Sequence, residues 1–222
     1  MRRDRGIVCL VTDRTRLGAP ADDPAAGARR LVELARRAVD AGVDIIQVRE
    51  RDLDAAPLAD IAAAIVEIAR SSATSVVVND RLDVAIACGA NGVHLRSDSY
   101  SPSASRAMTP AGFLIGRSVH HASEAREHAS AADYLIAGTV FATPSKPAGG
   151  PLLLSGGLAG IVEAVRVPVL AIGGITLDRV AEVAAAGAAG VAGIRLFLDG
   201  GAPLAAVVQA VRAPFDSVRA AS

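Results

Sequence analysis

Short runs of β-branched and aliphatic residues alternate with helical patterns eight times along this chain, and no other feature limits its fold as strongly. Several of these runs are continuously apolar, which is typical of strands that are covered on both faces. The runs occupy residues 7–11, 43–48, 75–78, 92–95, 113–116, 134–137, 167–172 and 190–194. We therefore predict an α/β fold, a single (β/α)8 TIM barrel, in which residues 1–222 form one domain.

A weak internal repeat supports this count of units. Four similar segments each join the end of a helical pattern to a β-rich run, and they recur at separations of about two units. These segments are residues 41–44, 88–93, 131–134 and 186–191. An open doubly wound sheet is the alternative fold. No Gly-x-Gly-x-x-Gly follows the first run, however, and this absence disfavours the alternative.

Charge and composition exclude several classes of function. The chain carries 23 basic and 23 acidic side chains, so it has no basic excess for nucleic acid or for an anionic membrane. The apolar run Ile7–Val11 is too short for a signal-peptide core, and no run approaches the ~20 residues of a membrane span. Cys9 and Cys88 have no metal-ligand spacing and are expected to be buried packing thiols. We expect a cytoplasmic protein without nucleic-acid or membrane partners.

Unusual polar residues follow the β-rich runs, and we expect them to meet at one end of the barrel. In TIM barrels the functional groups lie where the strands end and the loops to the helices begin. The candidates lie at the end of the second run or just after the second, third, fifth, sixth and seventh runs. They are Gln47, Arg49, Arg51, Asn79, Asp80, Ser118, His120, Thr143, Ser145, Lys146, Gly173 and Gly174. This clustering favours a catalytic mouth over a purely structural barrel.

The residue types at these positions favour phosphate chemistry. Lys146 is the only lysine of the chain, and a compact ammonium is not equivalent to a planar guanidinium. With Thr143 and Ser145 it forms a plausible oxyanion cradle, although an ordinary surface turn is the alternative. The pair Gly173-Gly174 opens a helical pattern and would expose backbone N–H groups to a phosphate, or else form only a tight turn.

The remaining candidates have both functional and structural interpretations. Arg49 suits a phosphate or pyrophosphate, and an ion pair with Glu50 is its alternative. Asn79 and Asp80 offer oxygen ligands of the kind that Mg²⁺ prefers. We expect His94 to pack at a strand end and His128 to be a surface residue; the roles of His120 and His121 are left open.

Several motifs in the same order closely resemble the thiamine phosphate synthase family and its thiazole tautomerase relatives, from about residue 7 to residue 210. They are Gln47–Arg51, Val78–Asp83, Ala90–Leu95, Ile115–His120, Ala132–Tyr134, Thr139–Lys146 and Ala171–Thr176. The resemblance implies an enzyme that joins hydroxymethylpyrimidine diphosphate to thiazole phosphate and releases pyrophosphate. Such dissociative chemistry mainly needs charge stabilisation on the leaving group and exclusion of water.

The resemblance also implies roles for individual residues. Gln47, Arg49 and Arg51 would bind the pyrimidine diphosphate, Asn79 would contact the pyrimidine, and Asp80 would hold Mg²⁺. The pyrophosphate and thiazole side would be lined by Ser118, Thr143, Ser145 and Lys146, and Gly173 with its neighbour Gly174 would bind the thiazole phosphate. The partners expected are therefore small phosphorylated molecules, and a homo-oligomer is left open.

Three departures from the family pattern point toward the tautomerase branch. Ser99 stands where the second Mg²⁺ aspartate belongs, with Asp98 one position early. Arg195 replaces the usual small serine of the phosphate site, where it adds a cation or fills part of the pocket. Val119 stands where the synthases usually have threonine, and a tautomerase would use His120 to move a proton.

The motifs around Asn79-Asp80 and Thr143–Lys146 match a synthase better, because a tautomerase has no pyrophosphate to hold. We therefore expect a synthase. A tautomerase that isomerises a thiazole carboxylate phosphate is the first alternative. A non-catalytic barrel that binds ligands of the thiamine pathway is the second.

Overall fold

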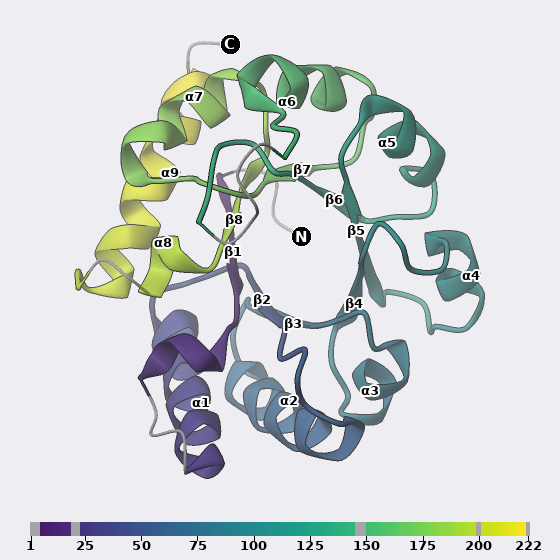
Figure 1. Ribbon diagram of the computed structural model, residues 1–222, viewed down its shortest axis with the longest axis vertical. Coiled ribbons are helices and arrows are strands. Elements are labelled where there is room, and N and C mark those ends of the chain that lie inside the picture. The colour runs from purple at the N-terminus through teal and green to yellow at the C-terminus, as the bar shows by residue number, and fades with distance from the viewer. Residues whose placement is uncertain (1–4, 19–22, 145–149, 199–200, 221–222) are drawn as a thin grey trace.

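The computed structural model describes residues 5–18, 23–144, 150–198 and 201–220. Its strands form a closed parallel barrel in which each strand pairs with its neighbours in sequence and β8 pairs with β1, which confirms the predicted TIM barrel (Figure 1). The strands are β1 (Ile7–Val11), β2 (Ile45–Val48), β3 (Ser75–Asn79), β4 (Gly92–Leu95), β5 (Leu114–Val119), β6 (Tyr134–Ala137), β7 (Val169–Ala171) and β8 (Gly190–Gly193).

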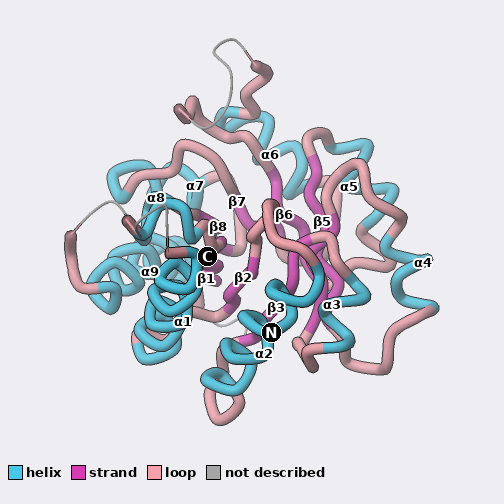
Figure 2. Tube along the Cα trace, turned by 60° about the horizontal axis from the view of Figure 1, so that its bottom comes forward, coloured by secondary structure: helices cyan, strands magenta, loops and turns pink. Residues whose placement is uncertain are grey.

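Helices surround the strands and cover the outer face of the barrel (Figures 1 and 2). They are α1 (Pro24–Asp40), α2 (Ala55–Ala69), α3 (Leu82–Ala87), α4 (Pro102–Ala107), α5 (Ala122–His128), α6 (Leu154–Glu163), α7 (Val180–Ala185), α8 (Arg195–Leu198) and α9 (Leu204–Ala220), with 3₁₀ turns η1 (Arg14–Leu17) and η2 (Leu177–Arg179). None of the helices in the described part of the chain is long and apolar enough to cross a membrane.

The observed boundaries follow the predicted runs closely. The largest difference is in β5, which continues through Val119, whereas its apolar signal ends at Gly116. The extension exists because residues 117–119 pair in register with β6, although Arg117 and Ser118 are polar. The helix that follows β5 begins at Ala122, with His121 as its N-cap.

Alternation along each strand separates an inner core from an outer core. Ile7, Cys9 and Val11 of β1 pack inside the barrel, whereas Val8 and Leu10 pack outward in the core shared with the helices. Burial raises the pKa of the Cys9 thiol, so the thiol stays protonated and apolar. The other free thiol, Cys88, is only half-buried, so the expectation of two buried thiols is correct for Cys9 alone.

Barrel closure needs a glycine at the start of β8. Gly190 pairs with Ile7 of β1. A Cβ atom at residue 190 would lie 2.0 Å from the Ile7 carbonyl oxygen and 2.7 Å from its carbonyl carbon, both of which are backbone atoms. A side chain could therefore be accommodated only if the two strands moved apart.

We predict that Gly190→Ala lowers the free energy of unfolding by at least about 2 kcal/mol, because it forces the closing pair of strands apart. Gly160→Ala is the matched control, since nothing lies within 4 Å of a Cβ atom at that position of α6. It should raise stability by about 0.5–1 kcal/mol, as expected for alanine inside a helix. Urea unfolding of both variants measures the difference, and equal stabilities would contradict the described closure.

Candidate functional site

Polar side chains enter the interior of the barrel near the carboxyl ends of β2 to β5. Gln47 follows the inner core residue Ile45 by two positions, and Asn79 follows Val77 in the same way. Alternation therefore directs both side chains inward. His94 of β4 is paired in register with Asn79 and extends the same layer. The sequence-predicted Gln47 and Asn79 are thus brought to one end of the barrel interior.

His94 makes the central hydrogen bond of this layer. Its side chain is buried, with 2% of the residue exposed, and its Nε2 atom lies 2.9 Å from the Ser118 hydroxyl oxygen. The ring stacks on Tyr134 with the ring centroids 5.7 Å apart. A Cβ atom at residue 116 would lie 2.5 Å from His94 Nδ1, so Gly116 makes room for the ring. His94 therefore packs as expected and also fixes the orientation of Ser118.

Burial, reinforced by the positive charges of Arg117 and Arg49, lowers the pKa of His94 to about 3. The imidazole is therefore neutral at physiological pH. A neutral ring has one donor and one acceptor nitrogen, which allows it to orient the Ser118 hydroxyl in either sense. It cannot supply a proton at neutral pH.

Three buried polar atoms in this layer have no hydrogen-bond partner among the described residues. They are Gln47 Nε2, His94 Nδ1 and Tyr134 OH. Buried polar atoms in folded proteins nearly always have a partner, whether protein, water or ligand. The floor of the barrel mouth thus offers donors and acceptors to a polar molecule that enters it.

A buried carboxylate organises the ends of β1 and β2. Glu50 accepts hydrogen bonds from the Thr12 hydroxyl at 2.6 Å and from the Arg14 backbone N–H at 3.0 Å, and it pairs with the Arg14 guanidinium at 3.2 Å. Burial raises the pKa of Glu50, although these bonds oppose the shift. The Arg49 backbone N–H donates to the same Thr12 hydroxyl at 2.9 Å. This network holds Arg49 in place through its backbone.

The alternative interpretation of Arg49, an ion pair with Glu50, is wrong for the structure. Glu50 is taken by Thr12 and Arg14, and no side-chain partner of Arg49 occurs in the described segments. Arg49 is half-buried, and its pKa is lowered first by burial and then by the positive charge of the exposed Arg51. The guanidinium groups of Arg49 and Arg51 thus lie together at the rim, and no carboxylate among the described residues is bound to Arg49. This arrangement is suited to binding an anion.

Asp80 lies just after β3, in a left-handed conformation with φ of 61°. Its backbone N–H donates to the His94 carbonyl oxygen at 2.9 Å, which continues the pairing of β3 with β4. The Ser99 hydroxyl donates to Asp80 Oδ1, and the Arg96 guanidinium pairs with Oδ2 at 3.5 Å. Ser99 therefore reaches the carboxylate that it was expected to adjoin.

The described residues contain no cluster of three or more His, Cys, Asp or Glu side chains that could hold a metal ion. Asp98, which lies one position before the place of the second aspartate, pairs with Arg96. A cation at this site would have the Asp80 carboxylate, the Ser99 hydroxyl and the substrate as its sources of oxygen. Mg²⁺ is commonly bound by one or two carboxylates together with substrate phosphate and water, so these residues fit the ion.

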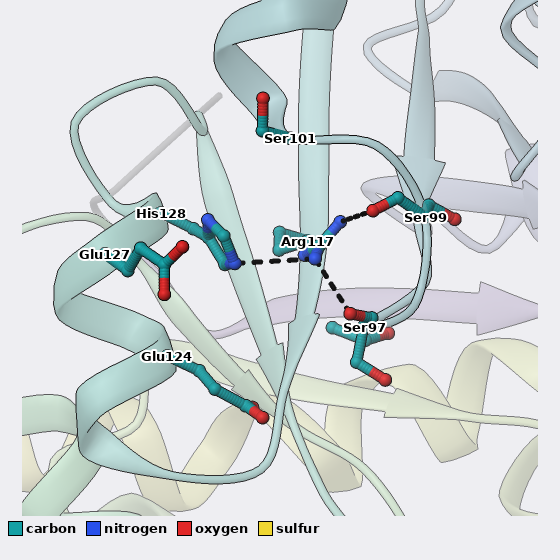
Figure 3. Close-up of a pocket in the computed structure, with 8 residues that line it drawn as sticks. Ser97, Ser99, Ser101, Arg117, Glu124, Glu127 and His128 are labelled. Carbon is teal, nitrogen blue, oxygen red and sulfur yellow. Dashed lines mark hydrogen bonds between the residues drawn. The ribbon is translucent and has the colours of Figure 1, made fainter.

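Arg117 fixes the loop that carries Ser99. It is almost fully buried, with 4% of the residue exposed, and its guanidinium donates to three loop carbonyl groups. Figure 3 shows two of these bonds, to Ser97 and Ser99. The distances are 2.8 Å to Tyr100, 2.9 Å to Ser97 and 3.2 Å to Ser99. Burial lowers the pKa of Arg117. The sequence does not indicate this function of Arg117, because its acceptors are backbone atoms of another loop.

The prediction that His128 is a surface residue is wrong. His128 is half-buried rather than a simple surface residue, and its Nε2 atom lies 3.4 Å from Arg117 Nη2. Figure 3 shows Arg117 between His128 of α5 and the loop of residues 96–101. A polar cavity of about 380 Å³ lies there, lined by Ser97, Ser99, Ser101, Arg117, Ser118, Glu124, Glu127 and His128.

Both ring nitrogens of His120 have partners. Nδ1 donates to the Gly138 carbonyl, which can only accept, so this nitrogen carries a proton. Nε2 lies 3.2 Å from the Ser97 hydroxyl, and the His120 backbone N–H donates to Glu124 at 2.6 Å. These bonds tie the ends of β5 and β6 to the neighbouring loop, which favours a structural function of the ring over proton transfer.

The two glycines after β7 have left-handed φ values of 99° and 63°. A Cβ atom at Gly173 would lie 2.5 Å from Thr139, and one at Gly174 would lie 2.4 Å from the Ala142 carbonyl oxygen. Packing alone therefore requires both glycines. Their N–H groups have no backbone acceptor among the described residues, so they stay available to an anion.

The other predicted site residues lie on two further loops. Thr143 is half-buried on the loop after β6, and Arg195 is exposed at the start of α8. Each has an interaction within the protein. Ser145 and Lys146 lie outside the described residues, so their functions stay predictions.

Residues 9–197 match the family model described as thiamine monophosphate synthase. The thiamine-phosphate synthase of Methanoregula boonei is 46% identical over 172 residues, which are 77% of this chain and 80% of that protein. The thiamine-phosphate synthase of Roseiflexus castenholzii is 37% identical over 203 residues, which are 91% of this chain and 85% of the relative.

Among solved structures, thiamine phosphate pyrophosphorylase from Pyrococcus furiosus superposes with a TM-score of 0.80 at 31% identity. The match covers 97% of this chain and 98% of that chain. A 3-hexulose-6-phosphate synthase also superposes, with a TM-score of 0.68 over 94% of this chain and 99% of the other. Its identity is 19%, so this likeness extends to the fold alone.

We predict that His94 makes stability depend on pH. Its folded pKa of about 3 lies below the ~6.5 of an unfolded histidine, so between these values only the unfolded chain binds this proton. The free energy of unfolding should therefore fall by up to about 1.4 kcal/mol per pH unit as the pH drops below about 6.5, and this contribution should be constant above it. Urea unfolding of wild type and His94→Gln across this range isolates the contribution, and identical pH slopes would contradict it.

Proposed function

The chain belongs to the thiamine monophosphate synthase family, and from this premise we propose that it couples hydroxymethylpyrimidine diphosphate to thiazole phosphate, forming thiamine phosphate and releasing pyrophosphate. It is a transferase of thiamine biosynthesis that acts on small phosphorylated substrates. The observation that carries this conclusion is the likeness to thiamine-phosphate synthases over nearly the whole barrel, at 46% identity in one of them.

The reaction breaks the bond between the pyrimidine methylene carbon and a diphosphate oxygen, and the thiazole nitrogen then bonds to that carbon. Negative charge develops on the departing diphosphate, so fixed positive charge aimed at it lowers the barrier. We assign this task to Arg49 and Arg51. The Arg49 guanidinium is suited to it, because no carboxylate among the described residues pairs with it.

The inner polar layer would bind the pyrimidine. Gln47 Nε2 is a buried donor that lacks a partner within the described chain, and a heteroatom of the ring would satisfy it. Asn79 lies on the neighbouring strand, two residues beyond Val77, which is the register partner of Gln47. Ser118, held by His94 at 2.9 Å, would present its hydroxyl to the substrate from β5.

Magnesium belongs to the proposal as a bound ion. Asp80 would hold it through the carboxylate, with the Ser99 hydroxyl beside it. When bound, the ion would supply positive charge to the leaving diphosphate. Members of the family usually offer two aspartate carboxylates to the ion, and this chain offers one. We therefore expect the protein to bind Mg²⁺ weakly.

The loops after β6 and β7 would bind the phosphate groups. Lys146, with Thr143 and Ser145, would stabilise the pyrophosphate, and the N–H groups of Gly173 and Gly174 would bind the thiazole phosphate. Arg195 would add a cation near that phosphate.

The tautomerase alternative is not favoured. The relatives that are 46% and 37% identical to the chain carry the synthase name. A tautomerase would use His120 to move a proton, but both of its ring nitrogens are engaged by Gly138 and Ser97.

A cytoplasmic location, one domain and assembly as a homo-oligomer stay predictions. Phosphorylated substrates support the first of these, because charged molecules do not cross a bilayer unaided.

We predict that the purified protein forms thiamine phosphate from the two substrates in the presence of Mg²⁺. Asp80→Ala should lower the turnover by about 10²-fold, on the scale of one lost electrostatic contact to the leaving group. Asp60→Ala on the outer helix α2 is the matched control and should retain the wild-type rate. Liquid chromatography of the product measures all three.

Two results would contradict the proposal in different ways. Isomerisation of a thiazole carboxylate phosphate by the wild type, without any thiamine phosphate, would replace the synthase by the tautomerase. Thiamine phosphate formation at the full rate in excess chelator would remove Mg²⁺ and the metal-binding role of Asp80 while leaving the synthase in place.

A further inference from the structure

Arg96 has no function in the mechanism above, yet it lies at the proposed metal site. It is the first residue after β4, and its side chain is 44% exposed. Its guanidinium pairs with Asp80 Oδ2 at 3.5 Å through Nη1, and with Asp98 through Nη2. One arginine thus contacts both acidic side chains of this corner of the mouth.

These contacts change the charge that a metal ion would meet. Ser99 donates to one oxygen of Asp80, and Arg96 pairs with the other. The carboxylate is therefore already neutralised by a cation that belongs to the protein. A magnesium ion at Asp80 would be repelled by the Arg96 guanidinium unless that group moved to an anion nearby.

The same guanidinium adds to the positive charge of the rim. Burial and Arg51 are the larger causes of the lowered pKa of Arg49, and Arg96 contributes to it as a further positive charge. Arg96 is thus close enough to Arg49 for the two charges to interact. Like charges that gather at one rim repel each other, and a bound polyanion relieves this repulsion.

The geometry of the contacts suits exchange between partners. A guanidinium can bind phosphate with two parallel hydrogen bonds, as it binds carboxylates. The pairs with Asp80 and Asp98 are partly exposed, so each is weak enough to be replaced. The loop that follows Arg96 is fixed by Arg117 through three carbonyl groups, so the arginine extends from a well-positioned backbone.

We propose that Arg96 is a third guanidinium that binds the diphosphate of the substrate and the pyrophosphate product, so that this chain binds pyrophosphate even without Mg²⁺. The inference rests on the proposed synthase function. In the free protein Asp80 and Asp98 hold Arg96 at the rim. When the diphosphate enters, the guanidinium turns to it and frees the Asp80 carboxylate.

Isothermal titration calorimetry with inorganic pyrophosphate in excess chelator tests the proposal. Wild type should bind pyrophosphate, and Arg96→Gln should bind it at least 10-fold more weakly. Arg70→Gln removes an equal charge from an exposed ion pair beyond the end of α2 and should bind within twofold of wild type. Arg96→Lys should bind with intermediate affinity, because an ammonium keeps the charge but not the fork. Thermal unfolding of each variant checks that it is folded.

The titration is then repeated with Mg²⁺. Added Mg²⁺ should tighten pyrophosphate binding by a larger factor in Arg96→Gln than in wild type, since the variant depends more on the metal. Equal metal-free affinities of wild type and Arg96→Gln would overturn the proposal, and so would equal factors of tightening. The assay for thiamine phosphate separates these outcomes from failure of the synthase function. If the wild type forms thiamine phosphate with Mg²⁺, it is a synthase, whether or not Arg96 binds pyrophosphate in the presence of chelator.

Discussion

The pairing of β8 with β1 closes the sheet, and the arrangement of every functional group depends on that closure. With all strands parallel, each one delivers its last residues to the same rim. Gln47, Asn79 and Ser118 therefore meet inside one mouth, although many residues separate them along the chain. Glycine at residue 190 permits the close approach on which this closure rests.

Much of the fold could be predicted from the sequence, because strands covered on both faces are continuously apolar. The predicted strand ended at Gly116, because the next residue of β5, Arg117, is charged. Arg117 faces outward beneath a loop, where three backbone carbonyl groups compensate its charge. No local pattern indicates those acceptors, because the chain must fold before they come near.

The candidate site was predictable to a similar extent. The position of Ser99 near Asp80 was implied by the family resemblance, whereas the pair between Arg96 and Asp80 depends on how two loops pack. Likewise, Glu50 follows Arg49 in sequence but pairs with Thr12 and Arg14 of another strand end. Sequence spacing thus locates the functional residues, and tertiary packing decides their partners.

The central claim is that cations at the β2 and β4 side of the rim hold the diphosphate while the barrel interior holds the pyrimidine. A crystal structure of the protein with thiamine phosphate and pyrophosphate tests it most directly. The account predicts pyrophosphate oxygens within hydrogen-bond distance of Arg49 and next to Asp80, with the pyrimidine ring against Gln47. Pyrophosphate bound instead in the cavity between Arg117 and α5, with Arg49 free of it, would contradict the account.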